Sequence, residues 1–489
     1  MRNIIIILLT LSFLNCYAQS NQIDKNKIKE DLAEIINDIS KNYVYLEEKN
    51  IDLNCIREYY EKQILSIETE EQTVLFFEYL LGEFYDSHLI LNTNRKSSFR
   101  LFSPIYATIE KRNPIISNVW QTQIENLDQN IIGAEILKIN GIDFTKAIEQ
   151  FPTHCNDKSS QKVREWIVNK ILAGRYNQPR VLTLKLENNN TVEFDLDKVK
   201  IKQTTKLLTS TIENDIGIII INNSLGNSSL INEFDKTLDK LINTKGLIID
   251  LRNTVDGGDS YIARGIMGRF INEPKPYQKH LTTEQYDGSP IIERSWIEYV
   301  SPRGKQYKKS IIVLVGRWTG SMGEGLAIGF DGMKRAEIVG TEMERLAGEM
   351  NGFSFKHQNY SYRLSIAKLY HVNGTQRDKY IPANYVKQTT LEKDEILDKG
   401  IYLLTSSQNQ TDSILQKELE LIATEDQTLR LLLPQVTEKF GRESSEYDYI
   451  WSLIHRQDTI CLNRLIKILD THGWVGKSRV GDKANQAIW

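Results

Sequence analysis

The chain has 489 residues, too many for one ordinary core, and we therefore expect two to four domains. Hydrophobic residues make up 40% and charged residues 26% of the chain, a balance typical of a globular protein rather than a disordered one. The formal net charge is -3 and no long run of one sign occurs, so nothing indicates nucleic acid or an anionic membrane surface as a partner.

Residues 1–18 have the pattern of a signal peptide. Arg2 supplies a positive charge, residues 4–14 form an apolar run too short to cross a bilayer, and Cys16-Tyr17-Ala18 offers small residues for cleavage. We therefore expect a mature chain that starts at or near Gln19 and is periplasmic, associated with the outer membrane, or secreted. Cys16 is also a candidate lipid anchor, although the residues before it make a poor lipobox. No other apolar run is long enough for a stable membrane span.

Two amphipathic helices are predicted next, over residues 26–46 and 74–84, because their apolar residues recur at helical spacing. The second helix leads into the polar sequence Asp86-Ser87-His88. Cysteines at three widely separated later positions imply no disulfide framework, although export permits a disulfide. His154 beside Cys155 is better interpreted as a loop pair than as a metal site, because no CxxC or HExxH motif accompanies it.

The middle of the chain changes from short β-like runs to alternating strands and helices. Gly133–Gly141 alternates like a strand and closes on an Asn-Gly turn. From residue 216, the apolar runs 216–221, 247–251 and 311–315 are separated by helical patterns. Such continuous apolar strands predict an α/β core with a sheet buried on both faces. Residues 405–412 are predicted to be a polar linker before a helical tail.

Ser321 lies in the segment Trp318-Thr319-Gly320-Ser321-Met322-Gly323-Glu324, between an apolar strand and a predicted helix. A serine at this junction has free backbone N–H groups and the helix dipole beside it, both of which favour a developing anion. The segment is not the GxSxG elbow of α/β-hydrolases, because position 319 is threonine. The alternative interpretation is an ordinary N-cap serine.

Two further elements fit a serine hydrolase. The strand at 247–251 leads to Gly257-Gly258, a loop that can direct an N–H group at a substrate carbonyl oxygen, although an ordinary turn also uses such glycines. A nucleophilic serine needs a base, and His88 is a candidate because histidine titrates near neutrality. The residues alone leave His357 and His371 open as alternatives.

Together these stretches resemble the C-terminal-processing (tail-specific) serine peptidase family, over roughly residues 70 to 405. The matching segments are Gly246–Gly258, Ile311–Gly340 and the PDZ-like Gly133–Gly141. One branch of that family pairs the serine with a lysine about 25 residues later, but here that neighbourhood reads Arg345-Leu346-Ala347-Gly348. The chain is more similar to the branch of the tricorn core protease and the interphotoreceptor retinoid-binding protein modules, which carries an Asp-Ser-His type motif.

The resemblance implies a role for each matching residue. Ser321 would be the nucleophile, His88 the base, and Ser87 a bridge between His88 and an orienting carboxylate. The N–H groups of Met322 and of Gly257 or Gly258 would form the oxyanion hole. The orienting acid is assigned to Asp378, with Glu342 and Glu349 as alternatives.

The expected fold is a multi-domain α/β protein. We expect a signal peptide at 1–18, a helical module with the histidine at 19–98, a PDZ-like domain at 99–204, a crotonase-like α/β peptidase core at 205–404, and a helical domain of unknown function at 412–489. The expected activity is an exported serine peptidase that hydrolyses peptides or the C-terminal tails of unfolded proteins, without metal or cofactor. The alternatives are a non-catalytic protein that binds apolar ligands or peptides, and an esterase for small substrates.

Overall fold

The computed structural model describes residues 23–127, 129–286, 288–409 and 413–488, so the expected signal peptide and Cys16 lie outside the described residues. The chain divides into two compact units, residues 1–398 and 399–489. None of the described helices is long and apolar enough to cross a bilayer. The predicted class, a multi-domain α/β protein, is confirmed.

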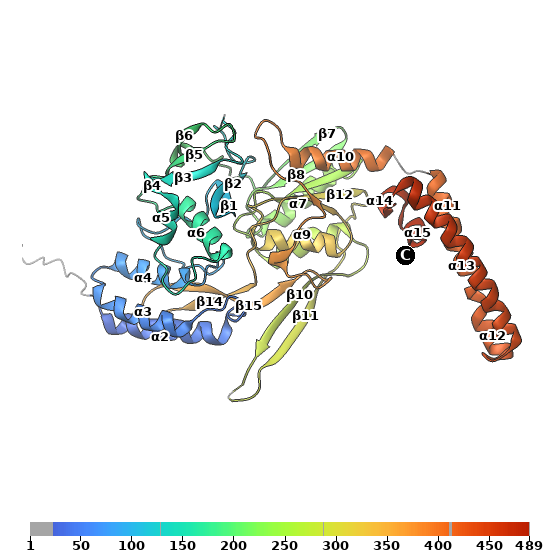
Figure 1. The fold of residues 1–489 in the computed structure, drawn as a ribbon, viewed down its shortest axis with the longest axis horizontal. Helices are drawn as coiled ribbons and strands as arrows, with labels where there is room; N and C mark the ends of the chain where they lie inside the picture. Colours follow the sequence, from blue (N-terminus) through green and yellow to red (C-terminus); the bar gives the residue numbers. More distant parts are fainter. Residues whose placement is uncertain (1–22, 128, 287, 410–412, 489) are drawn as a thin grey trace, which may run out of the picture. The chain divides into compact units, whose positions relative to one another are not determined.

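A small helical module begins the first unit. Asp24 caps the first helix by accepting the N–H groups of Asn26 and Lys27, and Thr69 forms a capping box with Gln72 at the third. The apolar faces of these helices pack on the hairpin of strands β14 (Glu349–Ser354) and β15 (Ser361–Tyr370), which Figure 1 shows beside them. The helices are α2 (Lys25–Asn42), α3 (Leu53–Gln63) and α4 (Glu70–Gly82), with the short η1 (Ile64–Ser66).

A six-stranded sheet with two helices follows. Its strands are ordered β1-β2-β3-β5-β6, and β4 pairs with β3. The predicted Asn-Gly turn is confirmed, since Asn140 and Gly141 join β3 to β4 with φ values of 50° and 78°. The elements are β1 (Ile105–Glu110), β2 (Asn113–Val119), β3 (Glu135–Ile139), β4 (Ile142–Asp143), α5 (Phe144–Glu149), α6 (Gln161–Ala173), β5 (Val181–Lys185), β6 (Thr191–Asp195) and η2 (Leu196–Lys198).

The central sheet has the order β16-β13-β12-β9-β8-β7, and all its pairs are parallel except β7 with β8. Every residue of β9 is buried, as expected for a strand covered on both faces. The elements are β7 (Leu208–Glu213), β8 (Ile216–Ile221), α7 (Ser229–Lys240), β9 (Gly246–Asp250), α8 (Ser260–Met267), η3 (Gly268–Phe270), β12 (Ser310–Val315), α9 (Met322–Gly332), β13 (Glu337–Gly340), η4 (Arg377–Lys379) and β16 (Asn384–Tyr385).

A third sheet joins the helical module to the central core. Its order is β11-β10-β15-β14, and its strands are β10 (Lys275–Glu284), β11 (Ile292–Val300), β14 (Glu349–Ser354) and β15 (Ser361–Tyr370). The segment after α4 pairs with β15 through the N–H of Asn92 to the carbonyl of Ser361 and the N–H of Arg363 to the carbonyl of Ile90. This pairing brings the loop that carries His88 up to the third sheet.

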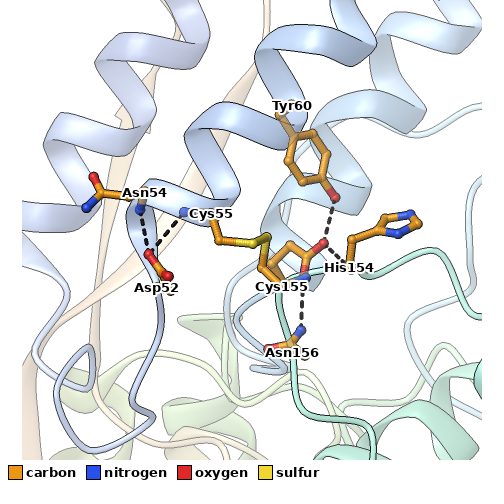
Figure 2. Close-up of a disulfide and its surroundings, with 8 residues drawn as sticks. Asp52, Asn54, Cys55, Tyr60, His154, Cys155 and Asn156 are labelled. Atoms are coloured by element: carbon orange, nitrogen blue, oxygen red, sulfur yellow. Dashed lines mark hydrogen bonds between the residues drawn. A yellow bond between two sulfur atoms is a disulfide. The ribbon is translucent and has the colours of Figure 1, made fainter.

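A disulfide between Cys55 and Cys155, which the sequence had not implied, connects α3 to the loop after α5 (Figure 2). Beside it, the buried carboxylate of Glu83 accepts the N–H groups of His154 at 2.7 Å and Cys155 at 3.0 Å. The disulfide therefore fixes the helical module to the domain of the six-stranded sheet. Cys155, which the sequence analysis assigned to a loop together with His154, is one of its two cysteines.

The second unit is helical, as the tail pattern predicts. Its core contains Leu415, Leu419, Ile422 and Val475. Its helices are α11 (Ser413–Thr428), η5 (Arg430–Leu432), α12 (Leu433–Phe440), α13 (Ser445–His472), α14 (Lys477–Val480) and α15 (Asp482–Gln486), preceded by α10 (Glu395–Asn409), which spans the division between the units. The predicted linker at 405–412 is wrong in its first part, because residues 405–409 continue α10; residues 410–412 lie outside the described residues.

Candidate active site

Ser321 occupies a strained turn between β12 and α9. Its φ of 48° and ψ of -109° are unusual for a residue with a side chain, and such conformations cost about 1–3 kcal/mol. The turn is held by the N–H of Gly320, which donates to the carbonyl of Thr254 at 3.2 Å. Ser321 stands at the N-cap position of α9, but its side chain makes no capping hydrogen bond. Its hydroxyl is therefore free for the contact with a general base that the sequence analysis predicted.

That contact is with His88. Ser321 Oγ lies 3.1 Å from Nε2 of His88, although the two residues are 233 positions apart in the chain. On the other side of the ring, Nδ1 lies 2.8 Å from the carbonyl oxygen of Ala347. A carbonyl only accepts hydrogen bonds, so the proton of the neutral imidazole is on Nδ1, and Nε2 is left to accept from Ser321.

The loop that holds His88 is anchored through Asp86. One carboxylate oxygen of Asp86 accepts the backbone N–H of His88 at 2.9 Å, and the other accepts the hydroxyl of Tyr43 at 2.6 Å. Lys49 lies 3.7 Å from the same carboxylate and donates to the carbonyls of Phe84 and Tyr85. Burial opposes the charged form of Asp86, but Lys49 and Tyr43 hold the pKa of this carboxyl below its usual value.

Burial also governs the protonation of His88, whose side chain is 7% exposed. Removing the imidazolium from water lowers the pKa of His88 to about 4, and the positive charges of Arg377 and Arg363 act in the same direction. At neutral pH the ring is therefore uncharged, which is the state that can accept a proton from a hydroxyl.

The backbone next to the Ala347 carbonyl is held in place by the buried side chains of Arg377 and Glu324. Arg377 donates to the carbonyl of Leu346 at 2.6 Å, and its Nε lies 3.3 Å from the carboxylate of Glu324. Glu324 comes from the first turn of α9 and accepts the N–H groups of Arg345 and Leu346. The segment at 345–347 is thus fixed both to the helix that follows Ser321 and to η4.

Burial has a strong effect on Glu324, which is fully enclosed. It raises the pKa of Glu324 to about 8, even though Arg377 and the two N–H groups favour the carboxylate. A second carboxyl, Glu344, lies against Gly320, and burial together with the nearby charge of Glu324 raises its pKa well above the usual range.

The three residues assigned to the oxyanion hole lie together beside Ser321, but they are not equivalent. The N–H of Gly257 donates to the carbonyl of Thr254 at 3.0 Å and is therefore already used. The N–H groups of Gly258 and Met322 donate to no other described residue. A side chain at Gly257, where φ is 66°, would place its Cβ 2.4 Å from that of Ser321. Gly257 thus allows close packing against Ser321, and the free donors belong to Gly258 and Met322.

The predicted relay to a carboxylate differs from what the structure has. Ser87 is exposed, and the atom at His88 Nδ1 is the Ala347 carbonyl oxygen instead of the Ser87 hydroxyl. Asp378 is next to Arg377 but is not a partner of either His88 ring nitrogen, and its Oδ1 finds no hydrogen-bond partner among the described residues. The Ala347 carbonyl oxygen thus takes the hydrogen-bonding position at Nδ1 that the bridging hydroxyl was expected to take.

The alternative residues have other partners. Glu342 accepts from Tyr385 and lies near Arg317, and Glu349 contacts His280 Nδ1 at 2.9 Å. The alternative bases are also elsewhere, since His357 pairs with Glu30 and His371 with Asp331. Sequence reasoning missed Glu324, Arg377 and Ala347. The one signal for Glu324 was a charged residue among the small and apolar residues of the first turns of α9.

Ser321 and His88 open into a cleft with a volume of about 1190 Å³. Its walls come from the loop after α4, from β10 and β14, and from the glycine loop after β9. Charged and polar groups are spread through this lining, including Glu344, Glu349 and Arg363. Within the described residues, no group of three or more His, Cys, Asp or Glu side chains could hold a metal ion.

A hydroxyl activated by a neutral histidine beside two free N–H donors is the arrangement of a serine hydrolase. Comparison with known proteins gives a narrower class. Residues 215–386 match the model of peptidase family S41, and residues 24–82 match that of the tricorn protease C1 domain. The chain therefore contains a peptidase S41 domain and is a serine-type peptidase. No curated protein matches its sequence.

Solved structures support the same fold. The chain is similar to mature CPAF complexed with lactacystin, with 14% sequence identity and a TM-score of 0.53 over 78% of this chain and 97% of that one. It is also similar to mature CPAF alone, with 12% identity and a TM-score of 0.52 over 74% and 92% of the two chains. At such low identities these matches establish the fold and nothing finer.

Proposed function

We propose that the protein is an exported peptidase that cleaves peptides or the C-terminal tails of unfolded proteins, with Ser321 as nucleophile and His88 as general base. The observation that carries the proposal is the 3.1 Å contact between Ser321 Oγ and His88 Nε2 at the wall of a large cleft. Family S41 supplies the class of reaction, and the preference for C-terminal tails follows the family resemblance.

In the proposed reaction, Ser321 Oγ attacks the scissile carbonyl carbon while its proton passes to Nε2 of His88. The N–H groups of Met322 and Gly258 donate to the oxygen of the tetrahedral intermediate. The imidazolium then gives its proton to the leaving amine, which leaves an acyl-enzyme. Water, deprotonated by His88, hydrolyses this ester and releases Ser321.

The hydrogen bond from His88 to Ala347 sets this mechanism apart from a Ser-His-Asp triad. A neutral carbonyl fixes the tautomer of His88 and orients the ring, as a carboxylate would. It stabilises the imidazolium less, because it carries only a partial charge. The low pKa of His88 has the same consequence: the base is always available at neutral pH, but each proton transfer to it is more costly.

A location outside the cytoplasm is part of the proposal. The signal-like residues 1–18 motivate it, and the disulfide between Cys55 and Cys155 supports it, because disulfides persist in oxidising compartments. Amino-terminal sequencing and lipid analysis of protein from a native-type host would test it. A start near Gln19 is expected. A mature chain that starts at Cys16 and carries a lipid would show that the exported protein is lipid-anchored. An intact Met1 in the cytoplasmic fraction would contradict export.

The role of Ser321 is tested with a fluorophosphonate probe. We expect the wild type to be labelled and Ser321→Ala to be folded but unlabelled, with turnover reduced on the order of 10⁶-fold. Ser445, an exposed serine that begins α13, provides a matched control, and Ser445→Ala should be labelled like the wild type. Equal labelling of Ser321→Ala and wild type would show that another residue is the nucleophile.

The alternative of a non-catalytic binding protein depends on a closed apolar cleft. The charged residues in the cleft lining do not favour it. An esterase is separated from a peptidase by comparing a peptide amide with the ester of the same acyl group, and a peptidase must cleave both.

A further inference from the structure

Strands β10 and β11 form a long hairpin that projects away from the sheets, as Figure 1 shows. Side chains of a strand alternate between its two faces, so cross-strand partners share a face. The partners Gln278 and Glu298, His280 and Trp296, and Thr282 and Arg294 therefore lie on one face, in that order from base to tip. We call these six residues the cleft face of the hairpin.

The base of the cleft face is part of the active-site cleft. Gln278, His280 and Glu298 line the same cavity as Ser321. His280 is 4% exposed and bonds to Glu349 of β14, which lines the cavity as well. Gln278 is 3% exposed, and its Oε1 has no partner among the described residues. A buried amide oxygen without a partner at a cavity wall is a site for a hydrogen-bond donor from a ligand.

Farther from the base of the hairpin, side chains of the cleft face stack on one another. The ring of His280 stacks on Trp296 with centroids 4.6 Å apart and an angle of 16° between the planes. The guanidinium of Arg294 lies 5.2 Å from the centroid of the Trp296 ring, and it pairs with Glu284 at 3.0 Å. The side chain of Arg294 is 63% exposed. The residues that line the cleft are therefore followed along the hairpin by an aromatic and a cationic side chain, which lie farther from the base of the hairpin.

We infer that the cleft face binds the part of a polypeptide substrate that extends beyond the residues held at Ser321. The occupant is an extended, unfolded chain: its apolar side chains would contact Trp296, and its backbone carbonyl groups would accept from Arg294. Aromatic and arginine side chains are the groups that most often anchor such contacts. The inference rests on the proposed function, because it assigns the hairpin to the substrate of that site.

The opposite face of the hairpin offers a competing partner. There Ile297 is 45% exposed and Tyr299 is 55% exposed, and neither lines the cleft. A second copy of the chain would be expected to cover these side chains, whereas a substrate that leaves the cleft would follow Trp296. Variants on the two faces therefore separate the two occupants.

The test compares a long and a short substrate on the full chain. Alkylated casein serves as the unfolded protein, and an internally quenched peptide taken from one of its cleavage sites serves as the short one. For Trp296→Ala we expect KM for casein to rise about five- to tenfold, with kcat and the kinetics of the short peptide unchanged. Arg294→Ala should raise KM for casein less. Ile297→Ala, on the opposite face, is the matched control and should leave both substrates unaffected.

Three outcomes would overturn the inference. Equal KM values of Trp296→Ala and wild type for casein would show that the face is not used. A loss shared by both substrates would show that Trp296 merely supports His280 and the cleft. A larger effect of Ile297→Ala, with a change of oligomeric state in analytical ultracentrifugation, would assign the hairpin to a second copy. Failure of the proposed function is distinct from all three, because then the wild type itself would cleave neither substrate.

Discussion

Arg377→Gln tests most directly how the base is held. In the wild type, Arg377 pairs with Glu324 at 3.3 Å and donates to the Leu346 carbonyl at 2.6 Å. It therefore fixes the backbone that presents the Ala347 carbonyl to His88. The substitution removes the cation, while glutamine is too short to make both contacts. The change should affect stability and catalysis separately, and each effect can be estimated.

The stability cost comes from Glu324. Breaking a buried ion pair on one side typically costs about 3–5 kcal/mol, because the remaining charge has lost its partner. Burial raises the pKa of Glu324 to about 8, so near pH 7 this carboxyl already carries its proton most of the time, and the substitution leaves a mainly neutral group instead of an unpaired charge. We therefore expect a loss of about 2–3 kcal/mol in the free energy of unfolding. The double variant Arg377→Gln with Glu324→Gln should recover part of that loss, since it leaves no buried charge.

The catalytic cost comes from the position of the Ala347 carbonyl. A displacement of about 1 Å at a catalytic contact can cost on the order of 100-fold in rate. We expect kcat/KM to fall about 10- to 100-fold, or about 1.4–2.7 kcal/mol of transition-state stabilisation. Loss of the nearby positive charge also raises the pKa of His88 from about 4, so the acid limb of the pH profile should move to higher pH.

The assay is kcat/KM as a function of pH, measured well below the melting temperature that circular dichroism gives for each variant. Arg377→Lys retains the charge but not the forked geometry, so it should restore the acid limb more fully than the rate. A folded Arg377→Gln with an unchanged rate and pH profile would refute the reasoning. So would fully additive rate losses for Arg377→Gln and Glu324→Gln, because the two residues are argued to act as one unit.

Three further predictions follow from the site and the disulfide. Because neutral His88 is the proposed base and burial lowers its pKa from 6.5 to about 4, wild-type kcat/KM should fall only as the pH drops through about 4; a limb near 6.5 would contradict this. Asp378→Asn and Ser87→Ala should each change kcat/KM less than about threefold, since neither residue touches His88, and a loss above about 100-fold would reinstate the carboxylate relay. Cys55→Ser removes the disulfide between two residues that are 100 positions apart and should lower the free energy of unfolding by about 2–5 kcal/mol, measured by denaturant unfolding without reductant. An unchanged midpoint would show that the disulfide does not contribute to stability.

Much of the fold could be predicted because its signals are local. The apolar strands at 216–221, 247–251 and 311–315 coincide closely with β8, β9 and β12, since a strand buried on both faces needs a continuous apolar sequence. The turn at Asn140-Gly141 was predictable for a similar reason, because few residues accept two successive positive φ values. Residues 405–409 were misjudged because a short polar sequence is compatible with the end of a helix as well as with a loop.

The site was predictable only where a side chain carries the chemistry. Ser321 and His88 were predicted from their residue types and short motifs, and the structure brings their side chains into contact. Ala347 gives no sequence signal, since its part in the site is a backbone carbonyl that every residue has. The alignment with the family near residue 378 was ambiguous. Asp378 was chosen because it carries a carboxyl group, and its neighbour Arg377, which holds the backbone in the structure, was not considered. The pairing of Cys55 with Cys155 depends on tertiary structure that spacing does not reveal.

The separation of His88 and Ser321 along the chain has a consequence for biogenesis. A chain that is synthesised or translocated amino terminus first presents the proposed base, His88, long before the proposed nucleophile, Ser321, and the Ala347 carbonyl comes later still. The site exists only when the helical module has docked on the hairpin of β14 and β15. A nascent chain is therefore inactive towards itself and its neighbours until folding is almost complete, and no separate inhibitory segment is needed for that interval.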